Sequence, residues 1–280
     1  MLGDTTMARY FGKNRGKAIS TGTLGGMIGI MILPFIAVYL TKIIGWQHVW
    51  LIASLSILIF FLPMLFIALK GQQLRHSNFT ESIKKNEESK NWKTMELVFD
   101  KKFYIFLPIS ISTSFISTGL TFHQIFIINQ KGWTLDMLAN GYVFLGIFSI
   151  IGLFFGGPII DKYNTKKTIL FSLLPLFIGI LTLIFFDSYI SLIIYMSFLG
   201  INLGITAPFI GSLWAELYGL ESIGSVKALV HAGSVFASAL SPVIFGYIID
   251  IGLGILSIGL ISFIIISIST LLPIFYKHIE

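Results

Sequence analysis

The sequence predicts an all-α protein, a polytopic bundle of eight transmembrane helices. The first observation is composition: 55% of the 280 residues are hydrophobic and only 11% are charged, against about 25% charged residues in soluble domains. The second is a series of long stretches without Asp, Glu, Lys or Arg. The third is the uneven distribution of Lys and Arg between those stretches.

Each charge-free stretch is long enough to cross a bilayer, which takes roughly 20 helical residues. The stretches are 18–41, 43–69, 103–130, 137–160, 168–186, 188–215, 228–249 and 251–276. They are uniformly apolar and lack the alternation of a membrane β-strand. We therefore expect one helix from each stretch.

The basic residues predict the topology. Eight crossings put both termini on one side, together with the loops 70–102, 161–167 and 216–227. These segments contain every Lys and Arg except Lys42 and Lys131. The positive-inside rule then predicts cytoplasmic termini. It also accounts for the net charge of +6, and no motif suggests nucleic acid as a partner.

The chain divides at one long polar segment, 70–102, which we interpret as a cytoplasmic linker with a short surface helix within 80–97. Two helices precede it and six follow. A shift of 208 residues aligns four Gly, Pro and Tyr pairs: Gly16 with Gly224, Gly25 with Gly233, Pro34 with Pro242, and Tyr39 with Tyr247. This diverged repeat indicates that 1–69 holds the last two helices of one half, and that 103–280 holds a complete six-helix half.

The charged stretch GGPIIDKYNTKK, from Gly156 to Lys167, lies between two apolar segments. It resembles the loop between the second and third helices of a half in the major facilitator superfamily, which reads roughly Gly-x-x-x-Asp-Arg/Lys-x-Gly-x-Lys/Arg-Lys/Arg. The matching residues are Gly157, Asp161, Lys162, Lys166 and Lys167. Asn164 replaces the second Gly and Ile160 replaces a small residue.

The resemblance covers nearly the whole chain. Residues 15–34 resemble the Gly-rich fifth helix of the superfamily, and the helix from Lys227 resembles the eleventh. The chain thus corresponds to helices five to twelve and is expected to be N-terminally incomplete. Segments 120–134 and 213–225 are similar to bacterial monocarboxylate and oxalate/formate transporters, which implies a bacterial plasma (inner) membrane.

The resemblance implies a secondary active transporter that moves a small solute, with a carboxylate as one candidate, by alternating access. A proton or solute gradient would drive it, without cofactor or metal. One alternative is a non-transporting fragment of such a protein. The other is a polytopic membrane enzyme, which would need clustered His, Asp or Glu at one membrane face; the sequence has no such cluster, so no enzyme is predicted.

Polar groups within the predicted spans are the candidates for the substrate pathway, because polar groups are costly in a bilayer. They are His123, Gln124, Asn202 and His231. His123 could bind solute or take up a proton, or be a buried histidine bonded to a neighbouring helix. Asn202 could equally join helices. No Lys, Arg, Asp or Glu lies mid-span, so an anionic solute would rely on His123 or on helices one to four.

Two sets of charged residues are candidates for a cytoplasmic gate. Asp161, with Lys162 and Lys166, could join neighbouring helices in one access state; the lysines could instead only fix the topology of the loop. Glu216 and Lys227 could pair across the next cytoplasmic loop, or form a solvated face.

Overall fold

The computed structural model describes residues 15–69, 94–163, 171–219 and 222–277. Its regular elements are all helices, which confirms the predicted fold class. They are α2 (Arg15–Ser56), the π-helical η2 (Ile57–Phe61), α3 (Leu62–Leu69), α5 (Thr94–Phe99), α6 (Lys101–Phe122), α7 (Gln124–Lys131), α8 (Leu135–Tyr163), α10 (Leu174–Phe185), α11 (Tyr189–Tyr218), α12 (Ile223–Asp250) and α13 (Ile255–Lys277).

Within the described ranges, six helices are long and apolar enough to cross a membrane. The predicted count of eight remains a prediction. One of the six helices, Thr23–Ile67, contains two of the predicted stretches, and the stretch 168–186 begins outside the described residues. Its described part is the shorter helix α10. Of the surface helix expected within 80–97, only the start of α5 falls in the described part of the chain.

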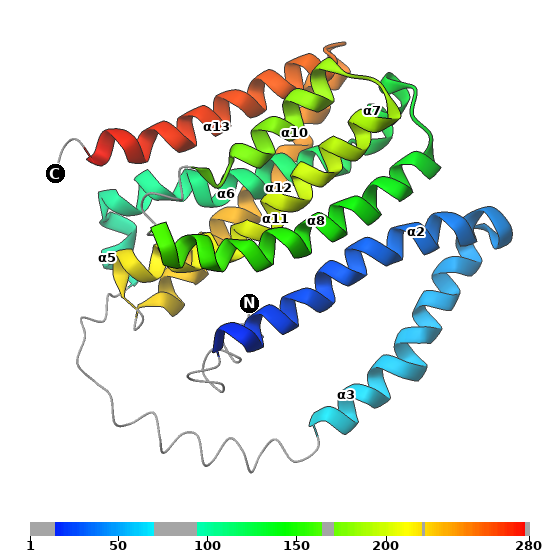
Figure 1. Cartoon of the computed structure of the whole chain (residues 1–280), viewed down its shortest axis with the longest axis horizontal. Helices are drawn as coiled ribbons and strands as arrows, with labels where there is room; N and C mark the ends of the chain where they lie inside the picture. Colours follow the sequence, from blue (N-terminus) through cyan, green and yellow to red (C-terminus); the bar gives the residue numbers. More distant parts are fainter. Residues whose placement is uncertain (1–14, 70–93, 164–170, 220–221, 278–280) are drawn as a thin grey trace.

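The elements α2, η2 and α3 form what we call the N-terminal arm, residues 15–69. The arm bends at Gly45, where φ is 78° and ψ is 156° inside the helical run. Residues with a Cβ atom rarely adopt this backbone conformation, whereas glycine adopts it at no steric cost. Figure 1 shows the chain turning back beyond this region, so that α3 runs away from α2.

The predicted single helix over 103–130 is wrong in one respect: it is broken. His123 adopts φ −95° and ψ 18°, which ends α6 and starts α7. α7 then ends at Gly132, whose φ of 69° is left-handed. The Trp133 N–H reaches back to the Ile128 carbonyl at 2.8 Å, as in a Schellman C-cap.

The elements α6 to α13 form the C-terminal bundle, and α8 and α11 make its closest crossing. A Cβ added to Gly204 would lie 2.1 Å from the Ser149 carbonyl oxygen, and one added to Gly200 would lie 2.3 Å from that of Leu145. Only glycine permits this approach. Small residues at helix contacts let membrane helices gain packing energy, since lipid gives apolar side chains no reason to prefer one another.

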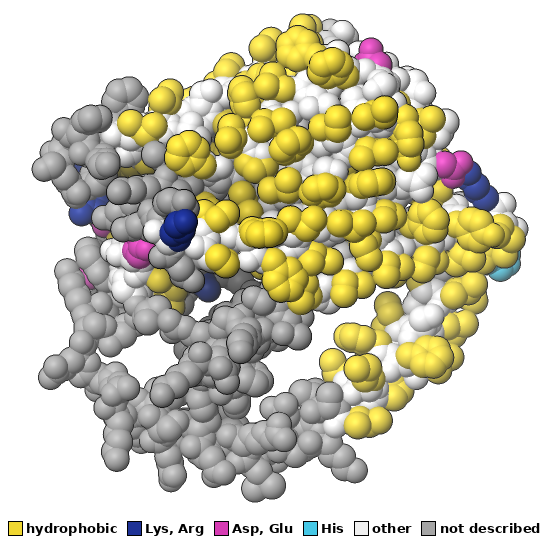
Figure 2. Space-filling model, in the orientation of Figure 1, with side chains coloured by type: hydrophobic (Ala, Val, Ile, Leu, Met, Phe, Trp, Pro, Cys, Tyr) yellow, Lys and Arg dark blue, Asp and Glu magenta, His cyan; other side chains and the backbone are white. Residues whose placement is uncertain are grey.

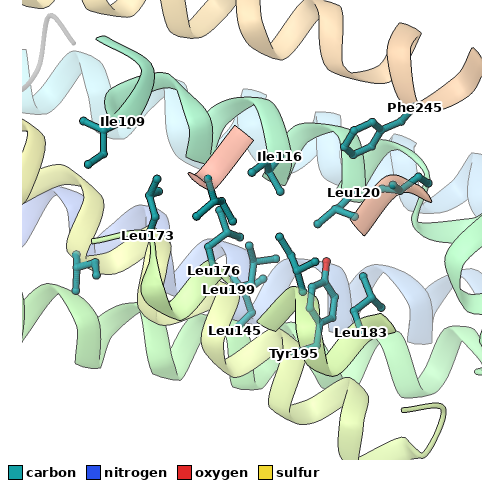
Figure 3. Close-up of a cluster of buried hydrophobic side chains, with 14 of the residues drawn as sticks. Ile109, Ile116, Leu120, Leu145, Leu173, Leu176, Leu183, Tyr195, Leu199 and Phe245 are labelled. Carbon is teal, nitrogen blue, oxygen red and sulfur yellow. The ribbon is translucent and has the colours of Figure 1, made fainter. Parts of the chain in front are cut away.

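One hydrophobic core runs through the bundle, between α6 on one side and α8, α10 and α11 on the other (Figure 3). Ile116, Leu176 and Phe245 are at most 1% exposed. The outer surface is also apolar: Figure 2 shows a broad hydrophobic band, with charged side chains toward its ends. A protein apolar both inside and outside is suited to lipid.

Candidate substrate site and gates

A small cavity lies among α6, α7, α8 and α11, and we call it the tyrosine cavity. Its volume is about 20 Å³, room for about one water molecule. Gln124, at the start of α7, and Tyr142 of α8 line it, and the Tyr142 hydroxyl donates a hydrogen bond to Gln124 Oε1 at 2.7 Å. Tyr195 of α11 lines it from within the bundle. Figure 3 shows the Tyr195 hydroxyl pointing from α11 toward Leu120 of α6.

His123 joins the bend between α6 and α7 to α12. Its Nε2 lies 2.9 Å from the carbonyl oxygen of Pro242. Because a carbonyl oxygen only accepts, Nε2 donates and carries a proton. The ring packs directly on α12, since a Cβ added to Gly246 would lie at van der Waals distance, 3.4 Å, from His123 Cε1. This geometry is that of a histidine bonded to a neighbouring helix, with Nδ1 as its second polar atom.

Asn202 is fully buried in α11, and its Nδ2 donates to the Ser172 carbonyl at 2.9 Å, just before α10. Its Oδ1 is buried without a hydrogen-bond partner. The amide thus joins two helices of the bundle. His231 is exposed on α12, and the structure does not bring it into the tyrosine cavity.

Two ion pairs lie beyond the cavity, toward the ends of α7 and α8. Lys42 of α2 pairs with Asp136 of α8, and both side chains are more than half exposed. Lys131 of α7 pairs with Asp187, and its Nζ also donates to the carbonyls of Ile184 and Phe186, at 3.2 and 3.3 Å. These are the two lysines that the predicted topology places outside the cytoplasm. Lys42 joins the arm to the bundle. Lys131 binds backbone carbonyls at the C-terminal end of α10.

Comparison with protein families gives a match to one family, described as Major Facilitator Superfamily, over residues 2–155 and 124–280. The two ranges together reach from residue 2 to the end of the chain.

The chain belongs to the Major Facilitator Superfamily. It is therefore an integral membrane protein of a transporter family, whose members handle small-molecule substrates within the membrane. No curated protein is similar enough to give a match.

The loop that resembles the superfamily motif is described only in part. α8 continues to Tyr163, so that Asp161 and Lys162 are helical, where the sequence predicted a loop from 161. Gly157 lies in the same helix, and Lys162 is exposed. Lys166 and Lys167 lie outside the described residues, so the proposed charge network of this motif remains a prediction.

The other predicted gate pair is Glu216 and Lys227. Glu216 lies near the C-terminal end of α11, and Lys227 lies near the N-terminal end of α12. Glu216 is exposed and Lys227 is half-buried. They do not form an ion pair with each other in the structure as described. Next to Glu216 lies a contact that the sequence did not suggest: Tyr218 donates to Asp100 Oδ2 at 2.9 Å, which joins the end of α11 to the start of α6.

Sequence reasoning missed Tyr142 and Tyr195. Tyrosine is common in apolar segments, so neither residue stood out, and only the approach of α8 to α11 places them in one cavity with Gln124. The partner of Lys42 was also missed, although an unpaired charge at the end of a span was a signal that one should exist. No group of three His, Cys, Asp or Glu that could hold a metal occurs among the described residues.

Proposed function

We propose that this protein is a secondary active transporter that moves a small solute by alternating access. The observation that carries the proposal is the joint between the N-terminal arm and the C-terminal bundle. Among the described residues, the extensive contacts of α2 outside the arm are with α8 alone, whereas η2 contacts chiefly α2 and α3, and α3 contacts chiefly η2. Two bodies joined along one pair of helices can rock against each other.

The α2–α8 joint is close at its centre and charged at one end. Met31 of α2 lies so near Gly146 of α8 that a Cβ on the glycine would be 2.3 Å from Met31 Cβ and 2.9 Å from its Cα. The Lys42–Asp136 ion pair then closes the joint at the end of it that lies near the bend at Gly45. An exposed pair contributes at most about 1 kcal/mol, which suits a contact that must break and form in each cycle.

This proposal assigns roles to the segments of the chain. Residues 1–69 are the last two helices of one transporter half, 70–102 a cytoplasmic linker, and 103–280 the second half, with both termini cytoplasmic. The motif residues Asp161, Lys162, Lys166 and Lys167, together with Glu216 and Lys227, would close the cytoplasmic side. Lys42 and Asp136 would close the opposite side.

The solute and the driving ion are part of the proposal. Small carboxylates are the first candidates for the solute, because segments 120–134 and 213–225 resemble monocarboxylate and oxalate/formate transporters. A proton gradient comes first as the driving force, and His123 is the candidate for the proton, through Nδ1. Gln124 follows His123 in the chain and lines the tyrosine cavity. The cavity is therefore the candidate site of contact with the solute.

The test is uptake into proteoliposomes of radiolabelled small carboxylates and neutral solutes, with and without a pH gradient. Because the chain has no cysteine, Lys42→Cys with Asp136→Cys provides a specific cross-linking pair across the joint. A bifunctional thiol-reactive reagent that forms a disulfide with each cysteine, such as a bis-methanethiosulfonate, should stop uptake, and reduction of the disulfides should restore it. Each single-cysteine variant, treated in the same way, is the control.

Two results would contradict the proposal. If the folded, inserted chain moves none of the solutes, the non-transporting alternative is favoured. If cross-linked protein transports as well as untreated protein, the arm and the bundle do not need to move apart at this point, and the rocking mechanism fails.

A further inference from the structure

The tyrosine cavity contains a polar atom that the protein leaves without a partner. The Tyr195 side chain is only 4% exposed, yet its hydroxyl has no hydrogen bond to any residue that the structure describes. Buried tyrosine hydroxyls usually find a partner. In Figure 3 this hydroxyl points toward Leu120 of α6, which also lines the cavity, so a partner for it would have to come from within the cavity.

The neighbouring polar groups offer both donors and acceptors. Gln124 Oε1 accepts from Tyr142, which leaves the two amide N–H donors of Gln124 and the lone pairs of the Tyr142 hydroxyl. The Tyr195 hydroxyl can donate or accept. A ligand group that both donates and accepts would satisfy all three side chains.

The cavity holds no charge. Every residue that lines it is uncharged, and most of them are apolar, such as Leu120, Leu138 and Met196. Lys131, at the far end of α7, is already held by Asp187 and two backbone carbonyls. An ionised carboxylate placed among such residues would lose its hydration without gaining a cation, which disfavours its binding.

We propose that the tyrosine cavity binds one uncharged donor–acceptor end of the transported solute, about as large as the single water molecule that the cavity could hold: a hydroxyl, or the N–H or O–H end of an amide or of a protonated carboxyl, with the rest of the solute outside the cavity. This inference rests on the proposed function and refines it, because it requires the bound group to be neutral. A carboxylate solute would then enter the site only with its proton.

The position of Tyr142 connects this site to the moving joint. Tyr142 and Gly146 are four residues apart on α8 and so lie on one side of the helix. Gly146 is the residue against which Met31 packs. Rocking of the arm about α8 would therefore act within one helical turn of the bond between Tyr142 and Gln124.

The test measures binding separately from transport. Thr121 lines the cavity and is exposed, so Thr121→Cys puts a single reactive thiol at its mouth. Labelling by a maleimide is timed in the presence of acetamide or of acetate at neutral pH, two probes of the same shape that differ in charge. Acetamide should slow labelling in a saturable way, and acetate should not.

Variants assign the effect to the hydroxyl. Adding Tyr195→Phe, which keeps the ring, should weaken protection by acetamide roughly tenfold, the effect of one lost hydrogen bond. Tyr142→Phe should also weaken it. Tyr247→Phe is the matched control, because Tyr247 lies 66% exposed on α12, and it should change nothing. A thermal unfolding curve of each variant checks that it is folded.

The proposal is overturned if acetate protects as well as acetamide, if neither probe protects, or if Tyr195→Phe behaves like Tyr247→Phe. Uptake by the same proteoliposomes separates the two claims. Uptake without protection would leave transport standing and remove this site. Protection without uptake would leave the site standing and remove transport.

Discussion

The N-terminal arm and the C-terminal bundle both contain helices apolar enough to cross a membrane, but their side chains make different contacts. In the arm, Met27 is the one buried hydrophobic residue that the structure describes, and Phe60, Phe66 and Ile67 are more than 70% exposed. In the bundle, every helix from α6 to α13 contributes to a continuous core. Hydropathy reports affinity for a bilayer; it does not report whether a side chain meets lipid or protein.

Polar side chains show the same difference. In the arm, Thr41, Ser54 and Ser56 bond to carbonyls of their own helix. In the bundle, hydroxyls such as those of Ser149 and Ser262 do the same, but other polar side chains also reach a second helix, as in the 2.7 Å contact of Ser112 with Ser269 and the 3.1 Å bond of Trp214 to Ser110. The bundle is therefore held by contacts between helices, and the arm chiefly by contacts within them.

Adding one methyl group to a glycine in each region should give the largest difference in stability between them. Gly204→Ala would place a Cβ 2.1 Å from a backbone oxygen of α8, whereas Gly25→Ala in the arm meets nothing within 4 Å. We expect Gly204→Ala to lower the free energy of unfolding by about 3 kcal/mol, and Gly25→Ala to leave it unchanged or slightly raised. Unfolding in detergent micelles measures both. Equal effects would show that the α8–α11 crossing is not a tight contact.

A substitution at the joint should separate the arm from the bundle without unfolding either. Gly146→Val would drive α2 away, because Met31 Cβ and Cα occupy the space, at a cost of about 2 kcal/mol to the contact. Cross-linking between Lys42→Cys and Asp136→Cys should fall severalfold, while the unfolding of the bundle is retained. If cross-linking stays as efficient as in the parent, the arm is held by contacts other than those to α8.

The ion pair in the bundle should contribute more to stability than the ion pair between the arm and the bundle. The Lys131 side chain is 7% exposed and serves Asp187 and two carbonyls, so Lys131→Met should cost about 2 kcal/mol of stability. Lys42, at 53% exposed, should cost about 0.5 kcal/mol or less when changed to Met. Thermal unfolding in low and high salt compares them, and salt should weaken the Lys42–Asp136 pair more, because both of its side chains are exposed whereas the Lys131 side chain is largely buried. The reverse order would mean that the arm depends on charge more than the bundle does.

A smaller effect than that of Lys131→Met concerns one buried amide. Asn202→Leu removes the bond to the Ser172 carbonyl and should cost about 1 kcal/mol, a typical value for a hydrogen bond between membrane helices. Ser54→Ala in the arm, whose hydroxyl bonds to its own helix, should cost nothing measurable. Comparison of the two unfolding midpoints tests this; a larger loss at Ser54 would contradict the assignment.

The candidate site was predicted only in part. His123 and Gln124 were found because a histidine and an amide are rare within apolar spans, and the structure places Gln124 in the tyrosine cavity and His123 against α12. Tyr142, Tyr195 and Asp136 were not found, since each is ordinary for its position along the chain. They acquire their roles through neighbours that lie 18 to 94 residues away.

The sequence by itself determined that this is an all-helical membrane protein, where most of its spans lie, and that it resembles the superfamily to which it belongs. These properties follow from the cost of placing charge and open backbone in a bilayer, which is paid segment by segment. Tertiary structure decided the break at His123, the bend at Gly45, the crossing of α8 with α11, and the gathering of three uncharged polar side chains around one small cavity. Those depend on which helices approach closely, and that is set by glycines and shapes whose partners are far away along the chain.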